Sequence, residues 1–183
     1  PGADRRRVSD AVAGVTVRDA TADDLPAITA IYNDVLRTSA AIWRDEPVSL
    51  ADRATWFRAQ QERGHPVLVA VGPGGEVLGF ASLGDFRPWP GSHPTVEHSI
   101  HVAEAHRGEG VGRRLMLAVI ERAATMGKEV LVAGVDAGNT ASIRFHERLG
   151  FVEVGRMPGI GRKFGEPVDL VLLQRGLSSD DGR

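Results

Sequence analysis

Hydrophobic and polar residues alternate along the chain with two different spacings, one typical of helices and one of strands. Apolar residues recur every three or four positions from Leu25 to Val35, after Thr21, which can form a capping box with Asp24. Ser49 with Asp52 repeats the capping signature and predicts a second helix that runs to about Arg63. The same spacing of apolar residues runs through 111–126, and a shorter helical stretch follows Asn139, a residue type favoured at helix N-termini. The pattern therefore predicts four helices.

Short β-branched runs between these helices predict strands. The expected strands cover 15–18, 67–71, 77–83, 95–102, 130–135, 151–157 and 168–173. The order is strand, two helices, three strands, helix, strand, helix, two strands, which predicts a mixed α/β domain around one central sheet. The alternation is too irregular for a TIM barrel. We expect one domain over 15–177, between flexible tails at 1–14 and 178–183.

Composition narrows the possible functions. The formal net charge of −2 gives no basic field that would indicate a nucleic-acid partner. No apolar run approaches the roughly 18 residues of a membrane span, and the first residues lack the apolar stretch of a secretory signal. The absence of cysteine excludes disulfides, thiolate zinc sites and a cysteine nucleophile, and it fits a cytoplasmic location. We expect no metal, since His98 and His101 are three apart in an expected strand and should point to opposite faces.

A glycine-rich segment at 107–112 carries the clearest chemical signal. Gly108, Gly110 and Gly112 alternate between an expected strand and an expected helix, so backbone amides can approach a ligand at a helix N-terminus that favours anions. Arg107, Arg113 and Arg114 add positive charge suited to a pyrophosphate. A Walker A loop would need Lys and then Ser or Thr after the last glycine, and a Rossmann fingerprint would need another glycine spacing near the first strand.

The segment Arg-x-x-Gly-x-Gly at 107–112 resembles the acetyl-CoA loop of the GNAT family of N-acetyltransferases. A second segment, 139–151, resembles the family's Asn-x-x-Ala/Ser helix that closes in Leu-Gly-Phe, and the order of elements agrees from about 15 to 177. The resemblance implies a mixed, mostly antiparallel twisted sheet flanked by about four helices, and acetyl-CoA as co-substrate. It implies cofactor contacts at Ile100, His101, Val102, Arg107, Gly108, Glu109, Gly110, Val111, Gly112, Arg113, Asn139 and Ser142.

Further segments are similar to one subgroup of that family, the phosphinothricin and methionine-sulfoximine N-acetyltransferases. They are 33–34, 41–43, 84–89, 95–100, 146–147 and 163–165. His101 departs from this subgroup, in which many members carry Tyr. The resemblance implies acetylation of methionine sulfoximine, methionine sulfone or phosphinothricin, which detoxifies glutamine-synthetase inhibitors. It also suggests a homodimer, which an exposed edge of the last strands would favour.

Two ionisable residues are candidates for the proton transfers. An amine must lose a proton before it attacks a thioester, and Glu97 lies in a strand that leads to the loop. His146 can donate a proton near neutral pH to a departing thiolate, and the resemblance implies that it pairs with Glu97. Which of the two is the base stays open. Because no cysteine can form an acetyl-enzyme, we expect direct transfer in a ternary complex.

Arg87 is the candidate for binding a substrate carboxylate, because a guanidinium can hold it with two parallel hydrogen bonds. Pro88 and Trp89 are expected to wall the pocket, with Glu97 beside them and Lys163 as a second cation. Two other hypotheses stay open: an acetyltransferase for another amine, such as a polyamine, an aminoglycoside or a protein N-terminus, and a non-catalytic acetyl-CoA-binding module.

Overall fold

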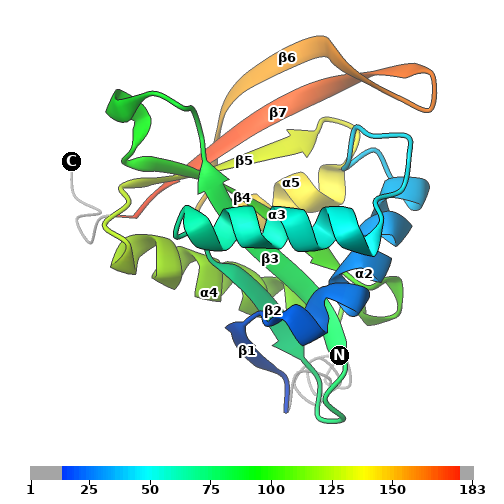
Figure 1. Cartoon of the computed structure of the whole chain (residues 1–183). Helices are drawn as coiled ribbons and strands as arrows, with labels where there is room; N and C mark the ends of the chain where they lie inside the picture. The colour runs from blue at the N-terminus through cyan, green and yellow to red at the C-terminus, as the bar shows by residue number, and fades with distance from the viewer. Residues whose placement is uncertain (1–13, 178–183) are drawn as a thin grey trace, which may run out of the picture. The chain divides into compact units, whose positions relative to one another are not determined.

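The computed structural model describes residues 14–177, so the expected tails at 1–14 and 178–183 lie outside the described residues except for Gly14. The described strands are ordered β1-β2-β3-β4-β5-β7-β6 and are accompanied by four α-helices (Figure 1). The strands are β1 (Thr16–Asp19), β2 (Val67–Val71), β3 (Val77–Asp85), β4 (Thr95–Val102), β5 (Val130–Asp136), β6 (Val152–Lys163) and β7 (Glu166–Gly176). The helices are α2 (Leu25–Thr38), α3 (Leu50–Glu62), α4 (Val111–Thr125) and α5 (Thr140–Glu147).

The described residues fall into two compact units. The first comprises residues 14–34, Val48–Ser82 and Ser99–Val119. The second comprises Val35–Pro47, Leu83–His98 and residues 120–177. The division falls inside β4, between His98 and Ser99, and inside β3, between Ser82 and Leu83.

The first unit packs helices against both faces of β3. A buried cluster joins α2 and α3 to β2 and β3; its members are Leu25, Ile28, Ile31, Phe57, Val67, Val69 and Phe80. On the opposite face, a Cβ atom added to Gly79 would lie 3.2 Å from Cδ1 of Leu115 in α4. Because neighbouring residues of a strand face opposite ways, Phe80 turns to α2 and α3 while Gly79 lets α4 approach closely.

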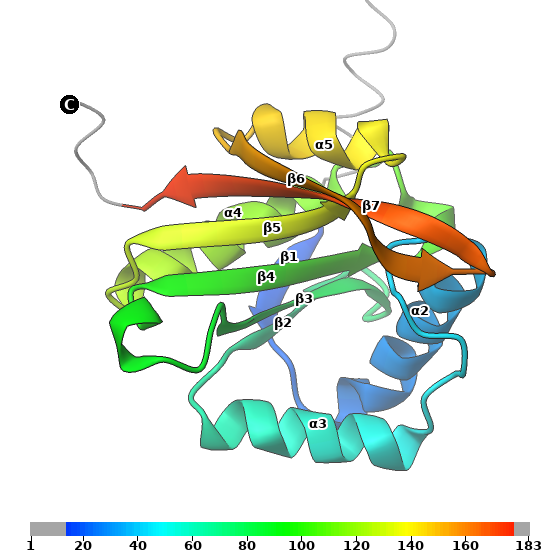
Figure 2. The same ribbon diagram turned by 90° about the horizontal axis from the view of Figure 1, so that it is seen from above.

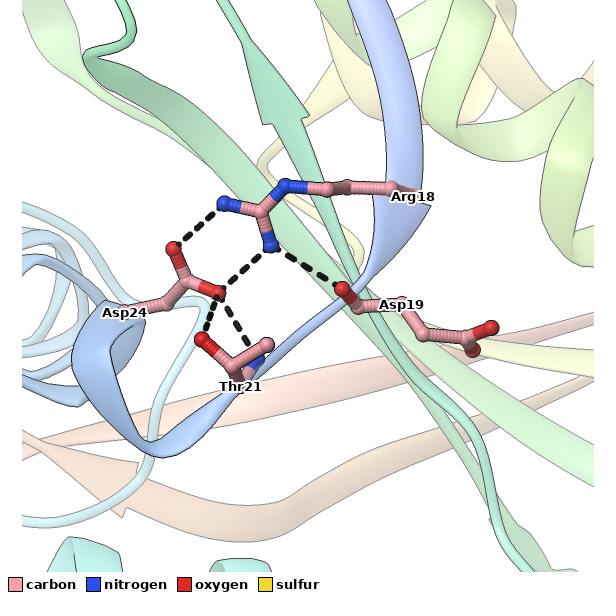
Figure 3. A network of polar contacts seen from close by, with 4 residues as sticks. All are labelled: Arg18, Asp19, Thr21 and Asp24. Carbon is pink, nitrogen blue, oxygen red and sulfur yellow. Dashed lines mark hydrogen bonds and ion pairs between the residues drawn. The ribbon is translucent and has the colours of Figure 1, made fainter.

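The entry into α2 is fixed by a buried carboxylate (Figure 3). Arg18 donates two hydrogen bonds to Asp24, of 2.7 Å to Oδ2 and 2.8 Å to Oδ1. The same Oδ2 accepts from the Thr21 amide at 2.7 Å. The Arg18 guanidinium holds the pKa of Asp24 below its usual range, so this charged cap is complete at neutral pH.

A second clamp joins α2 to the segment that leads into α3. The side-chain amide of Asn33 donates to the Val48 carbonyl and its oxygen accepts from the Val48 amide, each at 2.9 Å. Ser49 then caps α3 in a capping box with Asp52, as the sequence predicts.

The second unit is built on three neighbouring strands, β5, β7 and β6, which Figure 2 shows in that order. β5 pairs with β7 and β6 with β7, both antiparallel, while β4 pairs with β5 in parallel. The β6 ladder shifts register between Met157 and Gly161, where the Gly159 amide donates to Asp169 Oδ1 at 2.7 Å.

The predicted order of elements and the mixed α/β class are confirmed. The last two strands are longer than expected, because 151–157 extends to Lys163 and 168–173 extends to both sides. The run Pro158-Gly159-Ile160-Gly161 interrupts the apolar pattern in the sequence, whereas in the structure it forms a bulge within one continuous strand.

Candidate active site

The glycine-rich loop lies in the first unit, between β4 and α4. Gly108 and Gly110 have φ of +80° and +87°, which only glycine adopts readily. The Arg114 amide donates to the Gly110 carbonyl at 3.1 Å, so Gly110 is the cap of α4. The amides of Val111, Gly112 and Arg113 precede that bond, and helix geometry leaves such first-turn donors without intrahelical acceptors. The loop therefore has the backbone that an anion site requires.

The charged side chains near this loop point in different directions. Arg107 Nε donates to the Val102 carbonyl at 3.3 Å, and His106 Nδ1 lies 3.1 Å from Glu109 Oε2. Arg113 is exposed. Arg114 donates to the Val15 carbonyl at 3.1 Å, so its guanidinium ties α4 to the start of β1.

His101 lies in an aromatic cluster of the first unit. Its ring meets Tyr32 edge-on at 5.9 Å and Phe80 at 5.2 Å between centroids, and the Arg53 guanidinium stacks over Tyr32 at 3.9 Å. Burial lowers the pKa of His101 to about 4, and the charges of Arg53 and Arg107 act in the same direction. His101 is therefore neutral at physiological pH.

The parallel ladder between β4 and β5 is short. It contains the pairs Thr95↔Val130, Val96↔Leu131 and Glu97↔Val132. β5 continues its ladder with β7 to Asp136↔Leu170. The β4–β5 ladder thus ends at Glu97, the residue that is the candidate base.

Glu97 is half-buried in the second unit. Its Oε1 lies over β5, where a Cβ added to Gly134 would be 3.2 Å away. Burial raises the pKa of Glu97, and the positive charge of Arg87 partly opposes this effect. A raised pKa makes a carboxylate a stronger proton acceptor than an ordinary one, which suits a general base.

His146 lies with His98, not with Glu97. The two imidazoles stack with centroids 5.2 Å apart and planes 20° apart, and Phe151 meets both rings edge-on. Since Glu97 and His98 are consecutive in β4, their side chains leave opposite faces of the strand. The structure therefore brings His146 to the face opposite Glu97.

The hydrogen bonding of His146 fixes its neutral form. Its Nδ1 lies 2.7 Å from the Ser142 carbonyl, which can only accept, so Nδ1 carries the proton. Nε2 is buried and makes no hydrogen bond within residues 14–177. Burial lowers the pKa of His146, although the bond to Ser142 opposes this. The ring is therefore neutral at pH 7, with an unprotonated Nε2.

Arg87, Pro88 and Trp89 lie on an exposed loop of the second unit. Arg87 donates to the Phe86 carbonyl at 2.9 Å, and its guanidinium lies 4.3 Å from the Phe86 ring centroid. The Ser92 hydroxyl donates its one hydrogen between the carbonyls of Arg87 and Trp89, at 2.8 and 2.7 Å, and this contact braces the loop. The Trp89 side chain is prominent, at 67% exposure.

Lys163 has a different environment from Arg87. It is 3% exposed, donates to the Arg44 carbonyl, and lies 3.9 Å from Asp45 Oδ1. The neighbouring Trp43 indole lies against Gly161, where an added Cβ would be 2.5 Å from the ring. These contacts bind the segment after α2 to β6, and they turn the ammonium of Lys163 toward that segment.

Asn139 and Ser142 take part in the cap of α5. Asn139 Oδ1 accepts from the Ser142 amide at 3.0 Å, which is the helix-cap role that the residue type predicts. Their contact with a cofactor stays a prediction.

Sequence reasoning missed two residues of this site. The sequence gives no sign that His98 stacks on His146. Gly134 was not singled out at all. A lone glycine inside an apolar strand is the signal that marks it, since such a glycine often permits close approach.

Residues 14–177 lack both a cluster of metal ligands and a membrane-spanning helix. No group of three or more His, Cys, Asp or Glu side chains is arranged to hold a metal ion there. None of the helices in this range has the length and apolar character needed to cross a membrane.

Comparison with known proteins identifies relatives over most of the chain. Residues 28–151 match the model of the Acetyltransferase (GNAT) family. An L-methionine sulfoximine/L-methionine sulfone acetyltransferase of Pseudomonas paraeruginosa is 50% identical over 88% of this chain and 94% of its own. A phosphinothricin N-acetyltransferase of Alcaligenes faecalis is 40% identical over 91% of this chain and 84% of its own. The structure of yncA from Salmonella typhimurium, solved with its cofactor acetyl-CoA, has a TM-score of 0.87 and 44% identity, covering 92% of this chain and 97% of that one.

Proposed function

Because the chain belongs to the GNAT family of acetyltransferases, we propose that it transfers an acetyl group from acetyl-CoA to the α-amine of a small amino-acid analogue. The substrates are methionine sulfoximine, methionine sulfone or phosphinothricin, which the names of the relatives at 50% and 40% identity support. The observation that carries the chemistry is Glu97, a half-buried carboxylate with a raised pKa in the field of Arg87, at the end of the β4–β5 ladder.

The glycine-rich loop fits acetyl-CoA. Gly108 has open space around its Cβ position, and Gly110 exposes the first-turn amides of α4 to an anion. Arg107 and Arg113 supply positive charge for the phosphates, and the backbone of Ile100, His101 and Val102 binds the pantetheine arm. Acetyl-CoA supplies the thioester carbonyl that the amine attacks.

Glu97 acts as the general base. Its carboxylate takes the proton from the substrate ammonium, directly or through water, so that the nitrogen lone pair can attack. The new C–N bond forms as the C–S bond breaks. The sulfur leaves as a thiolate, which takes up the second proton that the nitrogen loses on becoming an amide. Transfer is direct, because the chain has no cysteine to carry the acetyl group.

His146 positions β4 instead of titrating during the reaction. Its proton is held on Nδ1 by Ser142, and its ring is buried against His98 on the face opposite Glu97. By filling that face, the pair of imidazoles fixes the strand that carries the base. This proposal replaces a pairing of His146 with Glu97.

Arg87 binds the substrate carboxylate. It is exposed, and its charge acts on Glu97, so a carboxylate held by Arg87 brings the adjacent α-amine toward the base. Pro88 and Trp89 form the apolar wall of this subsite. Lys163 contributes indirectly, by holding the segment at Arg44 and Asp45 in place through its contacts with both residues.

The physiological role that follows is detoxification of glutamine-synthetase inhibitors in the cytoplasm. The active form is a homodimer that pairs along β6. This strand is last in the strand order, and it exposes Val152, Val154, Met157 and Ile160 at 65%, 53%, 41% and 47%. Exposed apolar residues on an edge strand favour pairing with a second copy.

The test measures CoA release with methionine sulfone and with 3-(methylsulfonyl)propylamine, which is the same molecule without its carboxylate. Arg87→Ala should raise KM for methionine sulfone by about 10- to 100-fold, as expected for loss of a charge-assisted pair, and leave KM for the amine unchanged. Arg58→Ala, an exposed arginine of α3, is the control and should change neither value.

Three outcomes separate the hypotheses. Equal effects of Arg87→Ala on both amines contradict the carboxylate role. Turnover of spermidine or a short peptide, but of neither sulfone nor phosphinothricin, keeps the acetyltransferase and changes the substrate. Acetyl-CoA binding without turnover of any of these amines supports a binding module.

A further inference from the structure

Gly134 is the residue of β5 that lies directly beneath the Glu97 carboxylate. A Cβ built on Gly134 would lie 3.2 Å from Glu97 Oε1 and 3.4 Å from Leu170 Cδ1. The first distance is shorter than an ordinary contact, so even a methyl group would require the carboxylate to move. Gly134 belongs to β5 two residues beyond Val132, the partner of Glu97 in the ladder.

The backbone does not explain why this residue is glycine. Gly134 is absent from the glycines with φ in the left-handed region, so any residue could adopt its conformation. A glycine in the interior of a strand is unfavourable, and the other residues of Val130–Asp136 are mostly β-branched or apolar. The space above the residue is therefore the feature that requires glycine.

We propose that Gly134 is a positioning residue for the reaction: its missing side chain leaves the space in which Oε1 of Glu97 lies and keeps the substrate side of that oxygen open. Gly134 is itself exposed although it lies inside a strand, so solvent or substrate reaches the carboxylate across it. Leu170 supplies an apolar neighbour on the same side. This inference rests on the proposed role of Glu97 as the base.

The experiment compares Gly134→Ala with Gly176→Ala. Gly176 is also an exposed strand glycine, in β7, and an added Cβ there meets nothing within 4 Å. Gly134→Ala should lower kcat by about tenfold or more, since small displacements of a catalytic group cost large factors in rate. KM for acetyl-CoA and Tm should stay at the wild-type values. Gly176→Ala should leave all three quantities unchanged.

A second readout needs no turnover. Carbon-13 NMR of the Glu97 carboxyl in the ligand-free protein gives its pKa directly. The alanine methyl excludes water next to Oε1, so Gly134→Ala should raise that pKa further, whereas Gly176→Ala should not. If the wild-type chain does not acetylate any amine and the NMR shift still appears, the position of Gly134 is supported and the proposed function fails.

A double-mutant cycle tests whether Gly134 acts through Glu97. Glu97→Asp withdraws the carboxylate by one methylene, so the alanine methyl no longer meets it. Gly134→Ala should then have little further effect on kcat, and the two effects should be strongly non-additive. An equal loss from Gly134→Ala in both backgrounds, or an unchanged NMR pKa and kcat in the single variant, would overturn the proposal.

Discussion

Glu97 and His146 differ in environment in a way that sequence alone does not reveal. Burial acts on both, but it raises the pKa of the carboxylic acid and lowers the pKa of the imidazole, because it disfavours the charged form of each. Glu97 is therefore the group whose titration can appear in the rate at mildly acidic pH. The lowered pKa of His146 leaves its imidazole neutral at pH 7.

The first prediction concerns the base. Glu97→Gln should lower kcat by about 100-fold or more and leave the Kd of acetyl-CoA unchanged, because general-base catalysis contributes that order of magnitude. In the wild-type enzyme kcat should fall as pH drops through a pKa above the ordinary value of about 4.3. Steady-state rates between pH 4 and 8, together with calorimetric binding, check both effects.

The same pH profile discriminates between the two candidates. The acid limb should vanish in Glu97→Gln and persist in His146→Phe, which keeps a ring against His98 but cannot titrate. An acid limb that disappears in His146→Phe would instead return His146 to the proton transfers.

At this scale the sequence predicts residue types better than their partners. Glu97 and Arg87 were identified from the local motif, and the structure brings their charges into mutual influence. The stacking of His146 on His98 was not predictable, since it joins α5 to β4 across 48 positions of sequence through packing that no local pattern encodes.

Helix entry is the feature that best connects sequence and structure at the scale of elements. Thr21 with Asp24 and Ser49 with Asp52 have the same spacing and were both predicted as capping boxes. They differ in burial, because Asp24 is 6% exposed and paired with Arg18, while Asp52 is exposed. The spacing predicts the cap but not its strength.

The second prediction compares these caps. Asp24→Ala should lower the free energy of unfolding by about 1–2 kcal/mol, because the part-buried carboxylate loses its hydrogen bonds from the solvent-exposed Arg18 guanidinium and from the Thr21 amide. Asp52→Ala should cost about 0.5–1 kcal/mol. Urea denaturation at pH 7 measures both. The pKa of Asp24 is lowered by folding, so its contribution should be full above pH 4 and decline as pH falls below it.

The third prediction concerns the loop before α4. Gly110→Asp should abolish acetyl-CoA binding, because it places a carboxylate where the phosphates bind. Gly75→Asp is the matched control, since Gly75 also has φ of +87° but lies in the turn between β2 and β3. Both variants should lose about 1–2 kcal/mol of stability from backbone strain. Calorimetry that finds tight binding by Gly110→Asp would show that the loop is misassigned.

The order of elements was predictable because helices show helical spacing or a capping residue, and strands show short β-branched runs, within their own sequence. The ends of β6 and β7 were not, because Pro158 and Gly159 read locally as a strand terminator. In the structure, a hydrogen bond from Gly159 to Asp169 preserves the pairing across the interruption. That bond depends on β7 and is invisible in the local sequence.

At the scale of the whole molecule, β6 is the strand on which the proposed homodimer rests. It is long, lies at the end of the strand order, and exposes four apolar side chains. The sequence suggested an exposed edge in the last strands. The homodimer itself stays a proposal.

The fourth prediction tests the dimer. Val154→Lys should place a charge in the centre of the proposed interface and convert the protein to a monomer. Leu117→Lys, on the exposed part of α4, is the control and should keep the wild-type mass. Analytical ultracentrifugation at micromolar concentration measures both. A wild-type chain that sediments as a monomer rejects the dimer.

The bulge in β6 also limits how far such an association can extend. Between Met157↔Leu170 and Gly161↔Val168, three residues of β6 stand opposite one of β7, so the outer backbone groups are not evenly spaced. A further strand can match this edge over a short stretch only. Many copies can stack into a fibre only along an edge whose backbone N–H and C=O groups are evenly spaced without interruption. On β6 the bulge interrupts this row of groups after a few residues. The bulge in β6 therefore favours a closed oligomer, such as a dimer, over an open-ended fibre.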